Sequence, residues 1–165
     1  MQVAQFEKIF RALEQAKVRY VVVGGMAVIA HGVVRFTNDI DLVLAFDEEN
    51  LLRGIRALAS IGFKAKIPVD AEDFAKAEIR RQWVKDKNML VFQMSLFSDN
   101  DLPVGIFIDP PFDVERELAG ARRYELAPDL WVPVVQAETL IEMKQRAGRP
   151  RDLDDVVRLK RLLNL

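Results

Sequence analysis

The chain has 165 residues, of which 50% are hydrophobic and 30% are charged, a balance typical of one globular domain with a single core. Its formal net charge of −1 provides no global attraction to a polyanion such as nucleic acid. The chain has no cysteine and one histidine, which excludes disulfides and thiolate nucleophiles and argues against zinc clusters and Ser-His-Asp triads.

The first sixty residues alternate between helical and extended patterns. Apolar residues recur three and four positions apart from Phe6 to Leu13, as on one face of a helix. A β-branched run then stops at Gly24-Gly25, and Asp39 to Leu44 alternates polar with apolar residues. In chain order, these patterns predict a helix at 3–16, a strand at 19–23, a short helix at 26–32, a strand at 39–44 and a helix at 48–60.

The rest of the chain continues with strands that do not alternate strictly with helices. Asp47 is the expected N-cap of the helix at 48–60, Pro133 marks an edge strand, and Asp152 is the expected cap of the last helix. The turn "SDND" separates two strands. The predicted elements are an edge-like strand at 63–69, a helix at 70–82, strands at 88–97 and 102–108, a helix at 112–121, a strand at 131–135, and helices at 137–147 and 153–163.

This order of elements predicts an α/β (α+β) fold with a mixed sheet flanked by helices. We expect a single domain over residues 1–165, with a sheet-containing core at about 1–135 and C-terminal helices at about 136–165. No apolar run approaches the roughly 20 residues of a membrane span, and charges interrupt the N-terminal apolar run, so it does not read as a signal peptide. The expectation is a soluble, cytoplasmic protein without a membrane partner.

Asp39 and Asp41 are two residues apart on a predicted strand, so their side chains share one face. Two carboxylates that face one small space repel each other, and one pKa rises unless a cation lies between them. A magnesium ion resolves this repulsion because it prefers carboxylate oxygens, and it usually also holds substrate phosphates. The pair therefore predicts a divalent metal site, although a lone Asp-x-Asp is more often a solvated surface feature.

The glycine pair fits the same picture. Glycine lets the backbone approach a ligand closely, and the start of the following helix offers free N–H groups that attract phosphate. Gly24 and Gly25 are thus candidates to hold a triphosphate, and a simple tight turn is the alternative. Neither the dinucleotide-binding fingerprint nor the Walker A motif fits, because Met26 and Ile29 replace the required glycines and no G-K-[ST] occurs.

The stretch "GGMAVIAHGVVRFTNDIDLVL" resembles the signature of the nucleotidyltransferase fold superfamily, the DNA polymerase β-like enzymes. It is especially similar to small bacterial and archaeal nucleotidyltransferases related to AbiEii-type toxins, which often carry R-x-T-x-D-I-D. A second similarity lies in "LIEMKQRAGRPRDLDDVVRL", where a lysine-bearing helix precedes an arginine-rich break and a D-x-x-D helix. Together the two motifs bracket residues 20 to 160.

The resemblance implies a metal-dependent transfer of NMP from an NTP to a hydroxyl acceptor. By this implication Asp39 and Asp41 would be catalytic and would bind Mg²⁺ or Mn²⁺, while Gly24 and Gly25 would hold the triphosphate. The further nucleotide-binding residues that it implies are Arg35, Thr37 and Lys144. For Arg35, an ion pair with Asp39 is an alternative, and for Asp155 the expected partner is Arg151 or Arg158. The acceptor stays open between an RNA end, a protein and a small molecule, and a toxin–antitoxin setting would add a partner protein.

The third carboxylate of this superfamily has no obvious equivalent. Alignment of "PVGIFIDPP" by its apolar residues puts the expected aspartate at Gly105. Asp109 shares its face but lies some 13 Å further along a straight strand, so a bulge or register shift would be needed for Asp109 to act as the third catalytic carboxylate.

Other functions remain open at this stage. Without a third carboxylate the chain could be a degenerate nucleotide-binding or regulatory partner protein. A glycosyltransferase using Asp-x-Asp would explain the aspartates but not the nearby glycine pair. Arg146, Arg149 and Arg151 form the best local candidate for contact with a polyanion, and His31 reads mainly as a structural residue near a helix end.

Overall fold

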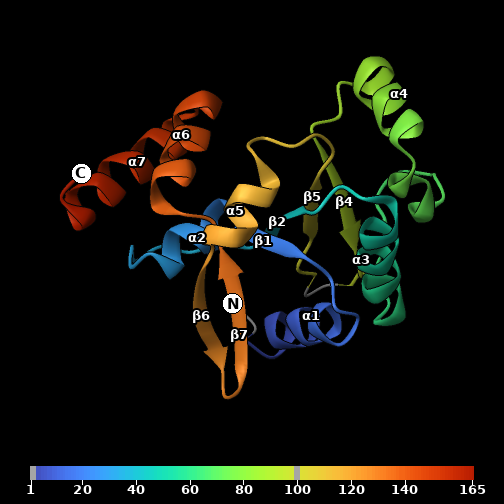
Figure 1. Ribbon diagram of the computed structural model, residues 1–165, viewed down its shortest axis with the longest axis horizontal. Coiled ribbons are helices and arrows are strands. Elements are labelled where there is room, and N and C mark those ends of the chain that lie inside the picture. The colour runs from blue at the N-terminus through green and yellow to red at the C-terminus, as the bar shows by residue number, and fades with distance from the viewer. Residues whose placement is uncertain (1–2, 99–100) are drawn as a thin grey trace.

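The computed structural model describes residues 3–98 and 101–165, and over these residues the chain forms one seven-stranded mixed sheet with helices around it (Figure 1). The strand order is β3-β4-β5-β2-β1-β7-β6. The strands are β1 (Tyr20–Val23), β2 (Ile40–Leu44), β3 (Lys64–Ala65), β4 (Val91–Ser95), β5 (Val104–Phe107), β6 (Arg122–Ala127) and β7 (Leu130–Val134). The predicted fold class is confirmed.

In Figure 1, helices α6 and α7 lie to one side of the sheet and α3 and α4 to the other, with α1 and α5 between these two groups. The bounds of the helices are α1 (Val3–Gln15), α2 (Gly24–Ala30), α3 (Glu48–Ser60), α4 (Ala77–Lys87), α5 (Val114–Gly120), α6 (Ala137–Ala147) and α7 (Pro150–Leu163), with a 3₁₀ helix η1 (Ala71–Ala75) before α4. No helix of the described residues is long and apolar enough to cross a membrane.

The core forms where the apolar faces of α1 and α3 meet the sheet. Phe6 and Phe10 of α1 are almost fully buried, as the helical spacing predicted. A side chain added at Gly54 of α3 would run into Leu44, so α3 packs closely on the face of β2 opposite to Asp41. That face of β2 is buried at Ile40, Leu42 and Leu44.

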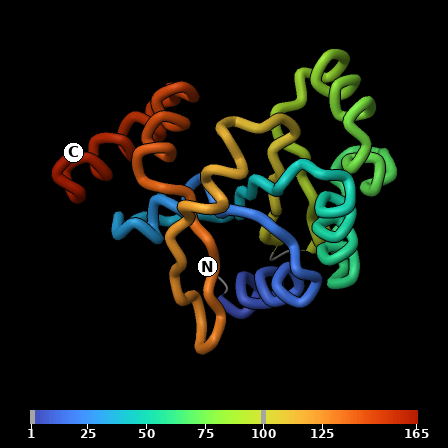
Figure 2. The backbone as a smooth tube through the Cα atoms, viewed as in Figure 1, coloured from blue at the N-terminus to red at the C-terminus, as the bar shows by residue number. Residues whose placement is uncertain are grey.

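The register of β2 with its two neighbouring strands positions the candidate site residues. Strand β2 runs antiparallel to β1, with Asp41 opposite Val23, and parallel to β5, with Asp41 opposite Gly105. Because β1 ends at Val23, the start of α2 lies beside Asp41. The residues between α2 and β2 pass beneath the C-terminal helices in the view of Figure 2, and Arg151 and Arg158 of α7 donate hydrogen bonds to the carbonyls of Phe36 and Val34.

Several predicted elements differ from the structure. The helix expected at 70–82 is divided into η1 and α4. Strand β6 was not predicted, and it makes β7 an interior strand, so the edge position assigned through Pro133 is wrong. Pro133 is tolerated because β7 pairs with β1 only through Val134. Helix α7 begins at Pro150 with Arg149 as its N-cap, so Asp152 is a third-position residue and not the cap. The predicted turn at 98–101 lies partly outside the described residues.

Candidate functional site

The glycine pair sits in a space too narrow for side chains. Gly24 has a φ of +67°, and a Cβ added there would overlap Oδ2 of Asp41. A Cβ on Gly25 would lie 2.9 Å from Oγ1 of Thr37 and 3.1 Å from a terminal nitrogen of Arg35. The pair is therefore enclosed by three of the residues that the sequence motifs singled out.

The start of α2 follows from this local geometry. The helix begins at Gly24 itself, two residues earlier than predicted, and Val23 at its N-cap makes no side-chain capping hydrogen bond. The first backbone N–H groups of a helix have no intrahelical partner and lie at the positive end of its dipole. The backbone beside Asp41 therefore offers donors to an anionic group.

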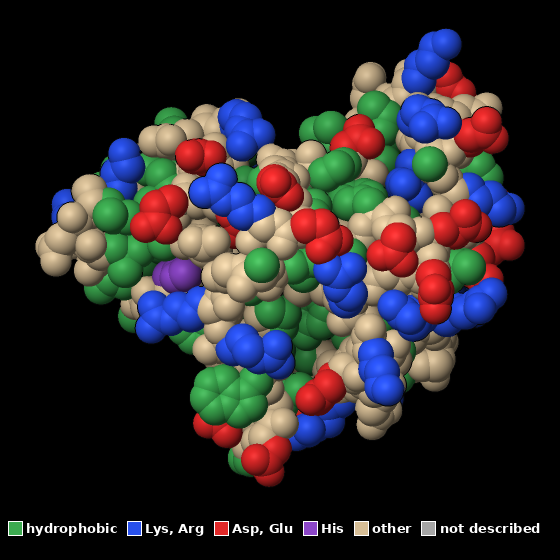
Figure 3. Space-filling model, in the orientation of Figure 1, with side chains coloured by type: hydrophobic (Ala, Val, Ile, Leu, Met, Phe, Trp, Pro, Cys, Tyr) green, Lys and Arg blue, Asp and Glu red, His purple; other side chains and the backbone are tan. Residues whose placement is uncertain are grey.

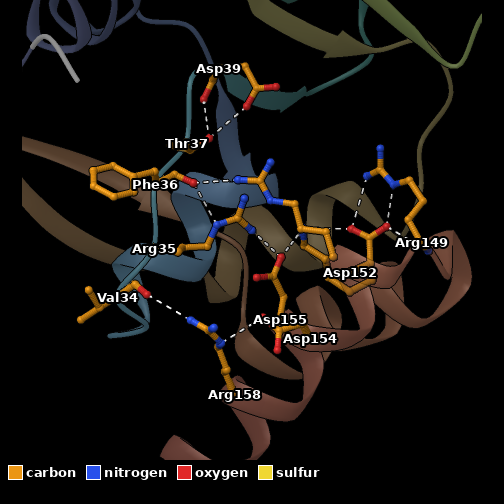
Figure 4. Close-up of polar contacts among 12 residues, drawn as sticks. Val34, Arg35, Phe36, Thr37, Asp39, Arg149, Asp152, Asp154, Asp155 and Arg158 are labelled. Atoms are coloured by element: carbon orange, nitrogen blue, oxygen red, sulfur yellow. Dashed lines mark hydrogen bonds and ion pairs between the residues drawn. The ribbon is translucent and has the colours of Figure 1, made fainter.

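Asp39 and Asp41 are brought together as expected. Asp41 is partly buried within β2, and Asp39 is exposed just before the strand. Thr37 is buried and its hydroxyl donates to Oδ1 of Asp39 at 3.0 Å, which orients that carboxylate (Figure 4). Thr37 thus contacts an aspartate as well as the glycine pair.

The charges of the two aspartates act on each other. Burial, together with the negative charge of Asp39, raises the pKa of Asp41 from 3.8 to about 6, while the charges of Lys144 and Arg149 lower it. The charged form of Asp41 is disfavoured, and a second carboxylate lies beside it. Such a pair of oxygen donors suits a divalent cation that prefers oxygen ligands. The residues present fit such an ion, which would be held by Asp39 and Asp41 with its remaining positions taken by water or phosphate.

The structure does not bring Asp109 to this pair. The pairing of β5 with β2 and β4 is continuous from Val104 to Phe107, so no bulge returns Asp109 toward Asp41. Asp109 is exposed beyond the far end of β5, where its charge acts on Arg80. The bulge or register shift considered for Asp109 is therefore absent, and its geometry gives no support for a third catalytic carboxylate.

Gly105 occupies the position that the alignment assigned to that carboxylate. It lies in register with Asp41, and a Cβ added there would be 2.8 Å from Oδ1 of Asp41 and 2.8 Å from a methyl group of Val91. Both neighbouring atoms are ends of side chains that can shift. An acidic side chain at residue 105 would thus point at the aspartate pair, but this chain has only hydrogen there.

Lys144 is held by two carboxylates in the interior of the α6–α7 pair. Its Nζ lies 3.2 Å from Asp152 and 3.0 Å from Asp155, and its side chain is only 10% exposed. Asp155 also pairs with Arg35, and Asp152 pairs with Arg149 at 2.6 Å. The five side chains form one alternating chain of charges, which we call the α6–α7 charge network.

This network ties the segment before β2 to the C-terminal helices (Figure 4). The Arg35 side chain is 11% exposed, donates to the carbonyl of Phe36 at 3.1 Å and pairs with Asp155, not with Asp39. The sequence had paired Asp155 with Arg151 or Arg158; instead Arg151 binds the Phe36 carbonyl and Arg158 pairs with Asp154. Contacts with α7 therefore hold in place the segment that leads to Asp39.

Arg149 is the residue whose place in the site sequence reasoning missed. Its pKa is raised, chiefly by the hydrogen bond to Asp152, with smaller contributions from the charges of Asp41 and Asp39. The sequence placed Arg149 in the arginine-rich break of the second motif and in a basic group with Arg146 and Arg151, and these were the available signals. Only the fold reveals that the charge of Arg149 reaches the aspartate pair.

His31 takes a structural position, as the sequence favoured. Its Nε2 donates to the carbonyl of Val135 at 2.8 Å, and Nδ1 of the neutral ring accepts from the hydroxyl of Tyr124 at 3.2 Å. Burial lowers the pKa of His31, partly offset by the hydrogen bond to Val135. The imidazole thus joins the end of α2 to the β6–β7 pair.

The glycine pair, the Asp-x-Asp strand beside it and the mixed sheet together define a nucleotidyltransferase fold. Solved structures agree. The antibiotic-resistance factor ANT(2'')-Ia superposes with a TM-score of 0.63 at 16% identity, covering 98% of this chain and 84% of that one. The lincosamide antibiotic adenylyltransferase LnuA gives 0.61 at 15% identity, with 96% of each chain covered. An antigenic nucleotidyltransferase-like protein from Paracoccidioides brasiliensis gives 0.51 at 17% identity, covering 93% of this chain and 72% of that one.

The sequence itself identifies the family. Residues 9–165 match the family described as nucleotidyl transferase AbiEii toxin of type IV toxin–antitoxin systems, and the chain belongs to this family. A search of curated proteins by sequence found no match. The resemblance drawn from the two motifs is thereby confirmed.

Proposed function

We propose that the chain is a metal-dependent nucleotidyltransferase that transfers NMP from an NTP to a hydroxyl group of an acceptor. The observation that carries the proposal is the close approach of Gly24 to Asp41, where only a residue without a side chain fits. Backbone N–H groups for a triphosphate and carboxylates for its cation then share one site.

Each group has a role in this proposal. Asp39 and Asp41 hold Mg²⁺ or Mn²⁺, and Thr37 orients Asp39 through its hydroxyl. The cation supplies charge stabilisation for the phosphates when it is bound. Gly24 and Gly25 hold the triphosphate. The acceptor hydroxyl gives its proton to water and its oxygen bonds to the α-phosphorus, while the bond between that phosphorus and the α–β bridging oxygen breaks and pyrophosphate leaves. Arg35 and Lys144 support the site through the α6–α7 charge network, since both side chains already engage carboxylates.

The acceptor is proposed only as a hydroxyl-bearing RNA end, protein or small molecule. Basic and acidic side chains are interspersed over the face shown in Figure 3, and this face carries no continuous basic stripe. The structural neighbours ANT(2'')-Ia and LnuA are described as an antibiotic-resistance factor and an antibiotic adenylyltransferase, which supports keeping a small molecule among the proposed acceptors. The family description favours a toxin–antitoxin setting. A second protein as regulator and a cytoplasmic location are part of our proposal.

The first test is thermal melting with each NTP and either Mg²⁺ or EDTA. A ligand at about 100 times its Kd stabilises the folded state by roughly 2.7 kcal/mol, or a rise in Tm of roughly 5–11 °C for a chain of this size. We expect this rise in wild type with Mg²⁺ and not with EDTA, and its loss in Asp39→Asn/Asp41→Asn. An equal rise in Tm for the double variant would mean that the nucleotide binds elsewhere than at this site.

A nucleotide-binding protein without efficient transfer is the second candidate function, and Gly105 is the observation that favours it. Transfer of label from an α-labelled NTP to acceptors separates the two candidates, because both bind nucleotide. Product formation by wild type supports the enzyme, and tight binding without product for any RNA, protein or small-molecule acceptor supports the second candidate.

Gly105→Asp is expected to increase the dependence of stability on Mg²⁺. Without metal, the added carboxylate crowds Asp41 and Val91 and repels Asp41, which should lower the free energy of unfolding by about 1–3 kcal/mol. Added Mg²⁺ should restore most of that loss in melting experiments. Gly105→Asn is the matched control, since it brings the same crowding without the charge and should gain little from Mg²⁺. Equal responses of the two variants to Mg²⁺ would argue against a cation beside Asp41.

A further inference from the structure

The charges of Lys144 and Arg149 both act on Asp41, but the surroundings of these two cations differ. Lys144 has both Asp152 and Asp155 on its ammonium group and a side chain that is only 10% exposed. Arg149 pairs with Asp152 alone and its side chain is 75% exposed. A cation that already has two carboxylate partners gains less from a phosphate than one with a free donor edge.

The guanidinium group of Arg149 has such an edge. Its Nε and one terminal nitrogen donate to the two oxygens of Asp152, at 2.6 Å and 3.3 Å. Within the described residues these contacts occupy one side of the planar fork and leave the other terminal nitrogen to solvent. In Figure 4 that end of Arg149 extends away from the α6–α7 charge network, toward the same side of the view as Asp39. Asp152 thus fixes the direction in which the free edge points.

Within the described residues, Arg149 acts on Asp39 and Asp41 through its charge without forming an ion pair with either of them. An anion attached to the aspartates through a cation would give the free donors of Arg149 a partner. The network also connects Arg149, through Asp152, Lys144, Asp155 and Arg35, to the wall of the glycine pair.

We infer that Arg149 binds the terminal phosphates of the NTP and the pyrophosphate that leaves, and that Lys144 is a positioning residue that holds Asp152 and Asp155 in place. This assignment rests on the proposed function. It places the α-phosphate at the aspartates and the β- and γ-phosphates between the start of α2 and the free edge of Arg149. The planar guanidinium suits two oxygens of a phosphate at once.

The test compares three ligands on Arg149→Gln by isothermal titration in Mg²⁺. The ligands are the NTP that stabilises wild type most, the corresponding NMP, and inorganic pyrophosphate. We expect Arg149→Gln to weaken NTP and pyrophosphate binding about 10- to 100-fold and to leave NMP binding within about twofold. Arg146→Gln is the matched control, because Arg146 is an exposed arginine at the end of α6 that contacts only the carbonyl of Pro111 among the described residues.

The ratio of NTP to NMP affinity separates a phosphate contact from a structural one. A general loosening of α6 and α7 would weaken all three ligands equally and would overturn the assignment, as would unchanged NTP binding. Arg149→Lys retains the charge without the fork and should lie between wild type and Arg149→Gln. Absence of NTP binding in wild type itself would overturn the proposed function, whereas normal wild-type binding that Arg149→Gln leaves intact would overturn this assignment alone.

Discussion

Asp155→Ala is expected to lower the free energy of unfolding by about 3–5 kcal/mol. Its carboxylate is only 3% exposed and pairs with both Arg35 and Lys144, so removal leaves two largely buried cations short of a partner. An uncompensated buried charge costs far more than the net contribution of the pair itself. Urea denaturation of wild type and variant measures the difference directly.

The neighbouring residue provides the control for this prediction. Asp154 pairs with Arg158 at 3.0 Å, but both side chains are about half exposed, so Asp154→Ala should change stability by less than about 1 kcal/mol. The two variants remove the same group one residue apart on α7. Similar losses for both would mean that the α6–α7 charge network does not hold Arg35 and Lys144 in solution as the structure describes.

Asp41→Asn is expected to stabilise the ligand-free protein and to abolish its function. Folding raises the pKa of Asp41 to about 6, above its ordinary value of 3.8. Between these values the folded state binds more protons than the unfolded state, so wild-type stability falls as the pH rises, and the cost is complete above about pH 6. At pH 7.5 this cost corresponds to about 2–3 kcal/mol, which the neutral amide avoids.

Two measurements check the prediction for Asp41. Urea denaturation at pH 7.5 should show Asp41→Asn to be the more stable protein by about 2–3 kcal/mol, and at pH 4 the difference should shrink below about 1 kcal/mol. Transfer of NMP by the same variant should fall at least about 100-fold, because the site loses a charged ligand. An Asp41→Asn variant that is less stable than wild type at pH 7.5 would show that the carboxylate is not strained in the folded state.

Much of the fold follows from periodicity in the sequence. The helical spacing of α1 reflects one buried face, and the continuous β-branched run of β1 reflects a strand buried on both faces. Together with the alternation around Asp41 in β2, such patterns are visible in the linear sequence. Strand β6 was missed because its sequence "RRYELA" is largely polar and exposed. Its pairing depends on β7 and not on any apolar face of its own.

The residues of the site likewise divide into those that local sequence patterns predicted and those that depend on packing of distant segments. The glycine pair and the two aspartates are close in sequence, so local reasoning reached them. Gly105 was singled out through the family resemblance, and only the fold shows that it lies in register with Asp41. The partners of Asp155 were wrong because helical spacing offers Arg151 and Arg158, whereas the buried partner comes from a segment 120 residues away. Arg149 belongs to the site only through the packing of α7, which no local pattern encodes.

The long separation between these partners also affects how the protein folds. The β1–β2 pair closes a short loop, and it can form early at small entropic cost. The contacts between residues 34–36 and α7 span 115 to 124 residues, so they can form only after most of the chain has collapsed. The glycine pair and the aspartates would therefore meet before Arg35 and Arg149 reach their places, and a partly folded chain would have the metal ligands without the cations that neutralise a triphosphate.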